Sequence, residues 1–294
     1  MKPQTVLSAD RFSTRLLLFV AAVPAFFVLI FAVPAYRHLL FSLCAAVAAV
    51  LGSREVAALF TRRDVAGRWH LAAGCSVLFP AVAYLENWGL VSGHAFGGAA
   101  AAVVALVLVV TLLPGTSVRG RHDDRLGQAG ATLFASLYPG LFIGYIVRLA
   151  GFGTPQWLLL TFFVAVFSND TIAYVAGKLA RGRTALGLPA SPTKTAIGYI
   201  TGITASVAAL IVAQRVFPGA PQFGTFEAAL GGAAMGICAA VGDLVESALK
   251  RAAQVKDSGE LIPGRGGLLD SIDSLMLCAP LFYFWMQRVH WTAT

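Results

Sequence analysis

The sequence predicts an all-α integral membrane protein, a bundle of about nine transmembrane helices. Apolar residues make up 57% of its 294 residues and charged residues only 12%, about half the charged share of a soluble globular domain. Apolar runs of about 20 residues, long enough to cross the hydrocarbon core of a bilayer, recur along the whole chain. The nine expected spans are 13–35, 37–52, 69–90, 96–114, 127–150, 156–178, 196–216, 226–248 and 271–290.

The basic residues predict the orientation of these spans. With the N-terminus in the cytoplasm, 18 of the 22 Lys and Arg residues fall in segments on the cytoplasmic side. The other four, Arg37, Arg148, Arg215 and Arg288, fall one per segment on the outside. The positive-inside rule therefore predicts a cytoplasmic N-terminus and an external C-terminus. This bias, with attraction to anionic lipid headgroups, accounts for the net charge of +8 without a nucleic-acid partner.

The connections are too short for a soluble domain, so we expect one continuous membrane domain. Residues 1–126, with spans one to four, form a structural N-terminal part, and residues 127–294, with spans five to nine, carry the site. Glycine and alanine in spans 96–114 and 226–248 predict close helix packing. Glu86, near the outer end of the third span, is expected to face the membrane interface without a functional role.

Acidic residues lie within or at the edge of the expected spans of the second half, where an ionisable side chain is costly and suggests a function. Asp243, Glu246 and Ser247 share one face of a helix near its cytoplasmic end. Asp270 and Asp273 share the first turn of the next helix, where the helix dipole favours carboxylates. The hairpin between these helices can bring Asp243 and Asp270 together, and two facing carboxylates suit Mg²⁺.

The loop between these helices carries four cations and a glycine pair. Its cations are Lys250, Arg251, Lys256 and Arg265. Salt bridges between them and the acids would produce the same pattern as a metal site. The backbone N–H groups of Gly266 and Gly267 could approach an anion closely, although a tight turn is the commoner reason for such glycines.

A second polar cluster begins inside the sixth span and continues into the loop that follows. Asp170 lies within the span, and Ser191, Lys194 and Thr195 lie in a basic, hydroxyl-rich loop that suits a polyphosphate tail. Positive-inside charge with a capped helix start at Ser191 explains the loop equally well. The five histidines are dispersed away from the acids, which favours a reaction whose nucleophile is already an anion, such as phosphate attacking phosphate.

The stretch from Ser247 to Asp273 resembles the signature of phosphatidate cytidylyltransferases, the CDP-diacylglycerol synthases. The matching residues are Ser247, Leu249, Lys250, Arg251, Lys256, Asp257, Gly259, Ile262, Pro263, Gly266, Gly267, Asp270 and Asp273. Segments around Asp170 and Lys194 also resemble this family. Within the stretch from Ser247 to Asp273, two positions depart from the signature: Arg265 replaces a histidine and Ser271 replaces an arginine. The segment around Lys194 also departs from the family in part. These departures fit a divergent paralogue.

The resemblance implies an enzyme that transfers the CMP moiety of CTP to phosphatidate at the inner leaflet, giving CDP-diacylglycerol and pyrophosphate. It assigns the metal to Asp243 and Asp270, with Glu246 and Asp273 as further ligands. Catalytic roles in neutralising phosphates go to Lys250, Arg251, Lys256 and Arg265. Substrate contacts go to Asp170, Ser191, Lys194, Thr195, Ser247, Gly266 and Gly267.

The resemblance also implies Mg²⁺, a second, monovalent ion such as K⁺, a homodimer, and a bacterial inner membrane with the active site facing the cytoplasm. Two other functions remain open on the sequence. A CTP-dependent kinase of a polyprenol-type lipid would share the nucleotide and the membrane setting. A non-enzymatic transporter of an anionic solute would place discontinuous helices in matching halves, whereas the acids here lie in one half.

Overall fold

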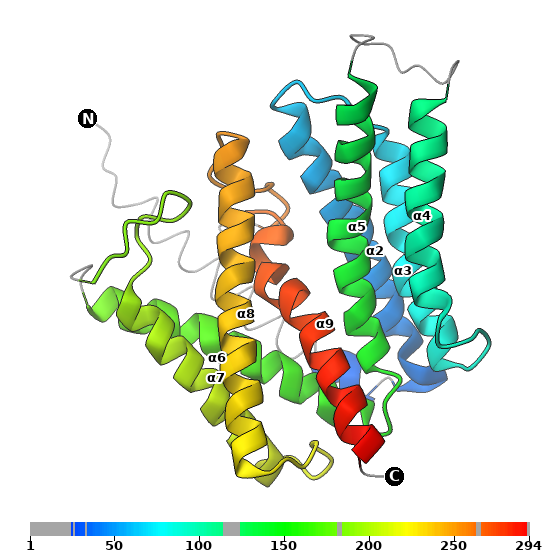
Figure 1. Ribbon diagram of the computed structural model, residues 1–294. Coiled ribbons are helices and arrows are strands. Elements are labelled where there is room, and N and C mark those ends of the chain that lie inside the picture. The colour runs from blue at the N-terminus through cyan, green and yellow to red at the C-terminus, as the bar shows by residue number, and fades with distance from the viewer. Residues whose placement is uncertain are drawn as a thin grey trace.

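The computed structural model describes residues 25, 27–32, 34–113, 124–180, 184–262 and 266–292. Over these residues the chain is helical, with a short π-helical segment, η1 (Val28–Ala32), and isolated bridges in two loops. The α-helices are α2 (Ala35–Thr61), α3 (Trp69–Asn87), α4 (Ala95–Leu112), α5 (Arg125–Leu149), α6 (Pro155–Leu179), α7 (Ala196–Val216), α8 (Thr225–Ala252) and α9 (Leu269–Thr292). The predicted all-α bundle is confirmed (Figure 1).

Six of these helices, α2 and α4 to α8, are long and apolar enough to cross a membrane. The protein is therefore an integral membrane protein with multiple spans. The expected first span, 13–35, lies mostly outside the described residues. The second was expected to be short, at 37–52, but α2 continues to Thr61 because the polar residues from Ser53 to Glu55 remain helical.

The helices form two groups that α9 joins. One group contains α2, α3, α4 and α5, in which α2, α3 and α5 all pack against one another. The other contains the tilted hairpin of α6 and α7, which packs against α8 (Figure 1). Because α9 contacts both α8 and α5, its first turn lies where the two groups meet.

Glycines set the close approach of α8 to α7, as the sequence predicted. A Cβ atom on Gly232 would lie 2.5 Å from the Cα of Val207, and one on Gly236 would lie 2.8 Å from the Cα of Ile203. No such contact explains the glycines of α4, since a Cβ on Gly97 or Gly98 would meet nothing within 4 Å in the described part of the chain. Close packing is thus confirmed for α8 and not for the glycines of α4.

The expectation that Glu86 faces the membrane interface is wrong. Its carboxylate lies 3.0 Å from the Nε of Arg148, and both side chains are at least nine-tenths buried. The Arg148 guanidinium also lies over the rings of Phe96 and Tyr283, at 4.7 and 4.2 Å from their centroids. A buried acid needs a partner, and Arg148 of α5 supplies it, which ties α3, α4, α5 and α9 together.

Candidate active site

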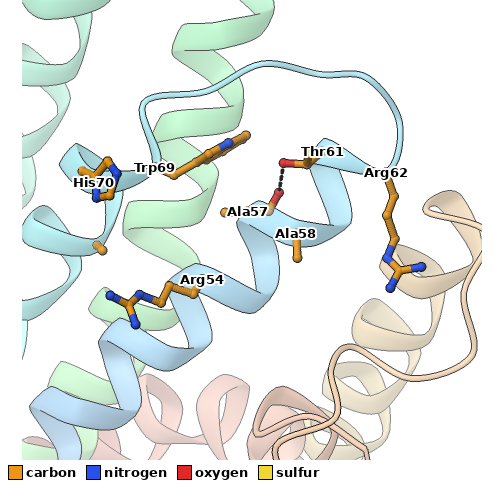
Figure 2. Close-up of a pocket in the computed structure, with 8 residues that line it drawn as sticks. Arg54, Ala57, Ala58, Thr61, Arg62, Trp69 and His70 are labelled. Atoms are coloured by element: carbon orange, nitrogen blue, oxygen red, sulfur yellow. Dashed lines mark hydrogen bonds between the residues drawn. The ribbon is translucent and has the colours of Figure 1, made fainter.

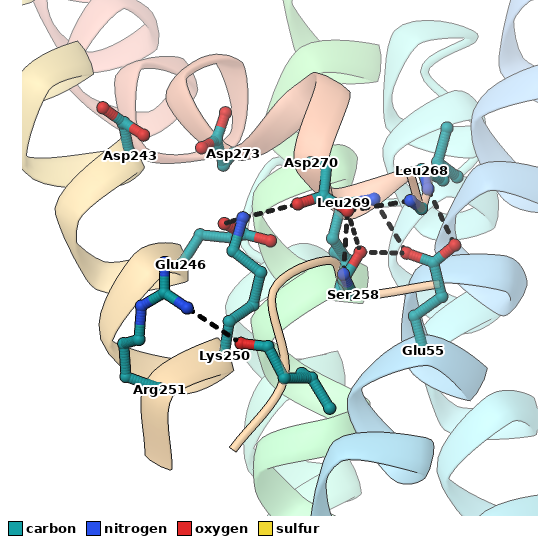
Figure 3. Close-up of polar contacts among 12 residues, drawn as sticks. Glu55, Asp243, Glu246, Lys250, Arg251, Ser258, Leu268, Leu269, Asp270 and Asp273 are labelled. Atoms are coloured by element: carbon teal, nitrogen blue, oxygen red, sulfur yellow. Dashed lines mark hydrogen bonds and ion pairs between the residues drawn. The ribbon is translucent and has the colours of Figure 1, made fainter. Parts of the chain in front are cut away.

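The candidate site lies where the C-terminal end of α8 meets the N-terminal end of α9. Figure 3 shows Asp243, Glu246 and Lys250 on α8 facing Asp270 and Asp273 on α9. The two helices approach closely here, because a Cβ on Gly242 would lie 2.8 Å from the carbonyl oxygen of Asp273. Because Gly242 has no side chain, α8 and α9 approach closely enough for their acidic side chains to lie in one region.

Lys250 connects the two helices. Its ammonium lies 2.5 Å from Oε2 of Glu246, one turn earlier on α8, and 2.5 Å from Oδ1 of Asp270 on α9. The Lys250 side chain is 13% exposed and that of Glu246 only 2%. Both carboxylates hold the buried ammonium of Lys250 in place. Removal of either carboxylate would leave the positive charge of Lys250 poorly compensated.

Asp270 organises the loop as well as binding Lys250. Its Oδ2 accepts hydrogen bonds of 2.8 Å from the backbone N–H and the hydroxyl of Ser258, and one of 2.8 Å from the backbone N–H of Gly267 (Figure 3). Ile262 and Gly266 exchange backbone hydrogen bonds of 2.8 and 3.0 Å, which close the loop just before α9. The carboxylate therefore fixes the loop and the first turn of α9 in one arrangement.

Glu55 of α2 is a site residue that the sequence analysis missed. Its carboxylate accepts hydrogen bonds from the backbone N–H groups of Leu268, at 2.7 Å, and Leu269, at 2.9 Å. It also accepts one of 3.0 Å from the Ser258 hydroxyl. Glu55 thus satisfies N–H groups at the start of α9 that have no partner within the helix. Its place beside Arg54 in a charged stretch of the sequence gave no sign of this role.

The glycine pair has a specific steric reason in this loop. Gly266 has φ +115°, and a Cβ there would lie 2.6 Å from Oδ2 of Asp270. A Cβ on Gly267 would lie 2.1 Å from the Ser258 hydroxyl and 2.5 Å from Glu55. Glycine allows both carboxylates to approach the backbone. In this structure the two N–H groups that the sequence analysis considered for an anion therefore have acceptors within the protein: that of Gly267 donates to Asp270, and that of Gly266 donates to the carbonyl oxygen of Ile262.

The second polar cluster contacts the first through Lys194. The loop between α6 and α7 places Lys194 in an ion pair with Asp243. Burial lowers the pKa of Lys194, but Asp243 raises it and the net shift is upward, so the side chain is cationic at neutral pH. From α6, Asp170 accepts a hydrogen bond of 3.3 Å from the hydroxyl of Ser274 on α9. The two clusters therefore form one continuous polar region.

Thr195 is the N-cap of α7, a role for which the sequence analysis considered Ser191. The Thr195 hydroxyl accepts a hydrogen bond of 3.0 Å from the backbone N–H of Gly198. Such an N-cap satisfies one of the first N–H groups of the helix. Ser191 lies in the preceding turn, where its backbone N–H donates to Leu188.

The remaining predicted residues differ in their accessibility. Ser247 is buried beside Glu246, whereas Arg251 and Lys256 are exposed. The guanidinium of Arg251 donates to the carbonyl oxygen of Val255 at 3.3 Å. Arg265 lies outside the described residues.

The donor set has the chemistry of a divalent-cation site. It consists of the carboxylates of Asp170, Asp243, Glu246, Asp270 and Asp273. Ion pairs in the described part of the chain supply two lysines to these five acids. Glu246 is 1% exposed, and its Oε1 accepts no hydrogen bond there. Carboxylate oxygens are hard donors of the type that Mg²⁺ prefers.

The carboxylates are not gathered into a closed ligand set. Among the described residues, no three acidic, histidine or cysteine side chains lie close enough together to hold a metal ion. Asp243 and Asp270, expected to face each other, instead pair with different lysines, Lys194 and Lys250. Asp273 is close enough to Asp243 and Asp170 for their negative charges to act on its carboxyl group. The lysines neutralise part of the negative charge that a metal ion would otherwise balance.

Comparison with known proteins decides the family. The model of the cytidylyltransferase family matches residues 13–289, nearly the whole chain. The chain belongs to the cytidylyltransferase family. The resemblance seen around Ser247 to Asp273 is therefore confirmed, and family membership extends through the first half of the chain, where the sequence analysis found a match only in hydropathy.

Individual relatives in the cytidylyltransferase family cover the chain to different extents. Uncharacterized protein YnbB of Escherichia coli is 37% identical over 169 residues, 52% of this chain and 55% of that protein. Phosphatidate cytidylyltransferase of Bacillus subtilis is 33% identical over 186 residues, 62% and 66% of the two chains. The chloroplastic phosphatidate cytidylyltransferase 4 of Arabidopsis thaliana is 31% identical over 281 residues, 84% and 67%. The chain thus spans about half to two thirds of the length of these relatives.

Proposed function

We propose that this cytidylyltransferase transfers the CMP moiety of CTP to phosphatidate. The phosphate oxygen of phosphatidate would attack the α-phosphorus of CTP, the bond between the α-phosphorus and its bridging oxygen to the β-phosphorus would break, and pyrophosphate would leave. CDP-diacylglycerol would remain in the membrane. The observation that carries the proposal is the polar region of five carboxylates and two lysines, Lys194 and the buried Lys250, at one end of apolar helices. Relatives named phosphatidate cytidylyltransferase support the substrate pair.

The positions of the cations suit this chemistry. Lys194, held by Asp243, stands in the loop proposed to bind the nucleotide, and Lys250 stands between the acids of α8 and α9. Both can neutralise charge that develops on phosphate oxygens in the transition state. A phosphate nucleophile is already anionic, so the reaction needs positioning and charge neutralisation more than a general base.

Asp243 and Asp270 would hold Mg²⁺, with Glu246 and Asp273 as further ligands or as acceptors around it. Bound there, the ion would supply charge neutralisation and orientation for the phosphates of CTP. A second, monovalent ion such as K⁺ and a homodimeric assembly complete the proposal, on the basis of the family resemblance. We also propose that the site faces the cytoplasm of a bacterial cell, since the basic segments that follow α2, α6 and α8 fall on the side that the positive-inside rule assigns to it.

Radiolabelled CTP separates the proposed reaction from the alternatives. The full chain in detergent would be incubated with Mg²⁺, phosphatidate and CTP labelled at either the α- or the γ-phosphorus. Label from the α-position should enter the lipid, and label from the γ-position should appear in pyrophosphate. Transfer of γ-label to a polyprenol-type lipid alcohol would identify a kinase. No transfer from either position, with the Asp243→Asn variant as background, would exclude both activities and leave the transporter hypothesis.

A further inference from the structure

The hydroxyl of Tyr138, in the middle of α5, is buried and has no hydrogen-bond partner among the described residues. Shorter hydroxyl side chains in this bundle bond to their own helix. Thr61 donates to the carbonyl oxygen of Ala57 at 2.8 Å (Figure 2), and Ser136 donates to that of Thr132 at 2.7 Å. The rigid ring of Tyr138 carries its hydroxyl too far from its own helix for such a bond. A buried polar group without a partner is costly, which suggests a function.

Tyr138 lies beside the acids of α8 and α9, although it belongs to another helix. It is part of the apolar cluster that contains Met276 of α9 and against which Val245 of α8 packs. Val245 directly precedes Glu246, and Met276 lies three residues after Asp273. The negative charges of Asp273 and Glu246 act on the Tyr138 hydroxyl. Tyr138 therefore brings a neutral hydrogen-bond donor from α5 to these acids.

Of the two acids, Glu246 has the greater need of a donor. Its Oε2 pairs with Lys250 at 2.5 Å, whereas its Oε1 has no partner among the described residues. Asp273, by contrast, accepts a hydrogen bond of 2.7 Å from the backbone N–H of Ser274. Movement of Lys250 to an external anion would leave Glu246 as a buried carboxylate without a donor, which is strongly unfavourable.

We propose that Tyr138 is a positioning residue, whose hydroxyl donates a hydrogen bond to Glu246 when Lys250 turns to a phosphate of the bound substrate. The inference rests on the proposed reaction, in which Lys250 neutralises phosphate charge. A hydrogen bond from a phenol to a carboxylate is charge-assisted and strong. It would keep the buried acid satisfied while the lysine acts on the substrate. Tyr138 itself would not touch the substrate.

Tyr138→Phe tests this role, because it removes the hydroxyl and keeps the ring. The full chain in detergent would be measured by thermal unfolding without substrate and by transfer of α-labelled CMP to phosphatidate. We expect an unfolding temperature equal to or above that of the parent protein, since the hydroxyl has no partner in the free protein. We expect kcat to fall on the order of tenfold with little change in KM. In a Glu246→Gln background the same substitution should have little further effect on kcat.

Tyr283→Phe is the matched control. Tyr283 is 6% exposed, as is Tyr138, but its hydroxyl accepts a hydrogen bond of 2.9 Å from the side-chain amide of Gln287. It also lies about 15 Å along α9 from Asp273. We expect this variant to lose stability slightly and to keep its kcat, the reverse of the result for Tyr138→Phe.

Fluorine NMR gives a measurement that does not depend on turnover. The full chain labelled with 3-fluorotyrosine would be titrated with CTP and Mg²⁺, and Tyr138→Phe would assign the signal. The Tyr138 signal should shift on binding, and it should shift less in Glu246→Gln.

The role of Tyr138 would be overturned by a signal that does not move. It would also be overturned by a Tyr138→Phe protein that keeps the kcat of the parent, or that loses stability and activity together. A signal that moves while the parent protein transfers no CMP would overturn the proposed reaction and support the contact between Tyr138 and Glu246.

Discussion

Glu55 accepts a hydrogen bond of 3.0 Å from Ser258, a residue 203 positions later in the chain. This contact links α2, in the first half of the protein, to the loop that precedes α9 (Figure 3). Ser258 also donates to Asp270, so the carboxylates of Glu55 and Asp270 hold the same loop from two sides. The first half of the chain therefore contributes directly to the order of the candidate active site.

We expect Glu55→Ala to lower both stability and activity. The substitution would leave the N–H groups of Leu268 and Leu269 without their acceptor, at a cost of about 2 kcal/mol or more in the free energy of unfolding. Glu55→Gln keeps one acceptor oxygen and should lose less. Thermal unfolding in detergent and turnover would be measured together. Glu260→Gln is the control, because Glu260 is an exposed acid of the same loop. An equal loss of stability and activity in Glu260→Gln would contradict a specific role for Glu55.

Asp243→Asn should abolish turnover while the protein remains folded. The variant would lose a proposed ligand of Mg²⁺ and the partner of Lys194. Because the Asp243 side chain is 26% exposed, the amide can be accommodated, and we expect only a small change in unfolding temperature. Turnover would be measured across a Mg²⁺ titration. Activity within a few-fold of the parent protein would contradict the assignment of Asp243 to the metal.

Gly267→Ala should destabilise the loop before α9. An added Cβ would overlap the Ser258 hydroxyl and the Glu55 carboxylate, and the resulting displacement is expected to cost about 2 kcal/mol. Gly74→Ala is the matched control, since a Cβ there meets nothing within 4 Å and alanine favours a helix. Unfolding temperatures of the two variants decide the comparison. A Gly267→Ala protein as stable as Gly74→Ala would contradict the packing described for this loop.

Arg265 is predicted to contact a phosphate of CTP or of phosphatidate, in compensation for the serine at position 271. Arg265→Ala should then cost about 2 kcal/mol or more of transition-state stabilisation. Arg265→His, which restores the residue usual in the family, should retain more activity than alanine, and adding Ser271→Arg should recover more. Because both positions would act on one bound anion, their effects should be non-additive. Kinetics of the single and double variants test this prediction. Additive effects would show that Arg265 only adds charge to the loop and does not contact the phosphate.

The orientation predicted from basic residues can be tested with fusions. A reporter active only outside the cytoplasm should be active after Thr294, and the same reporter inserted after Arg63 should be inactive. A reporter active only in the cytoplasm should give the opposite pattern at the two positions. Cytoplasmic activity after Thr294 would contradict the nine-span orientation and the proposed cytoplasmic site.

Much of the fold was determined by the sequence alone, because a bilayer imposes a simple rule. A segment that crosses it must be apolar over about 20 residues and must satisfy its backbone hydrogen bonds internally. The described helices from α3 to α9 accordingly begin and end within a few residues of the expected spans. The family also followed from local sequence, since Ser247 to Asp273 carries the spacing of its signature residues in one continuous stretch.

Only the tertiary structure decided which charges meet. Nothing in the sequence around Glu55 or Glu86 shows that one caps α9 and the other pairs with Arg148. Likewise, the spacing of Asp243 and Asp270 predicted that both lie on one hairpin. It could not show that Asp243 pairs with Lys194 and Asp270 with Lys250. The physical reason is that a buried charge takes its partner from whichever element the packing places beside it. That choice depends on contacts between residues far apart in the chain, which local patterns do not contain.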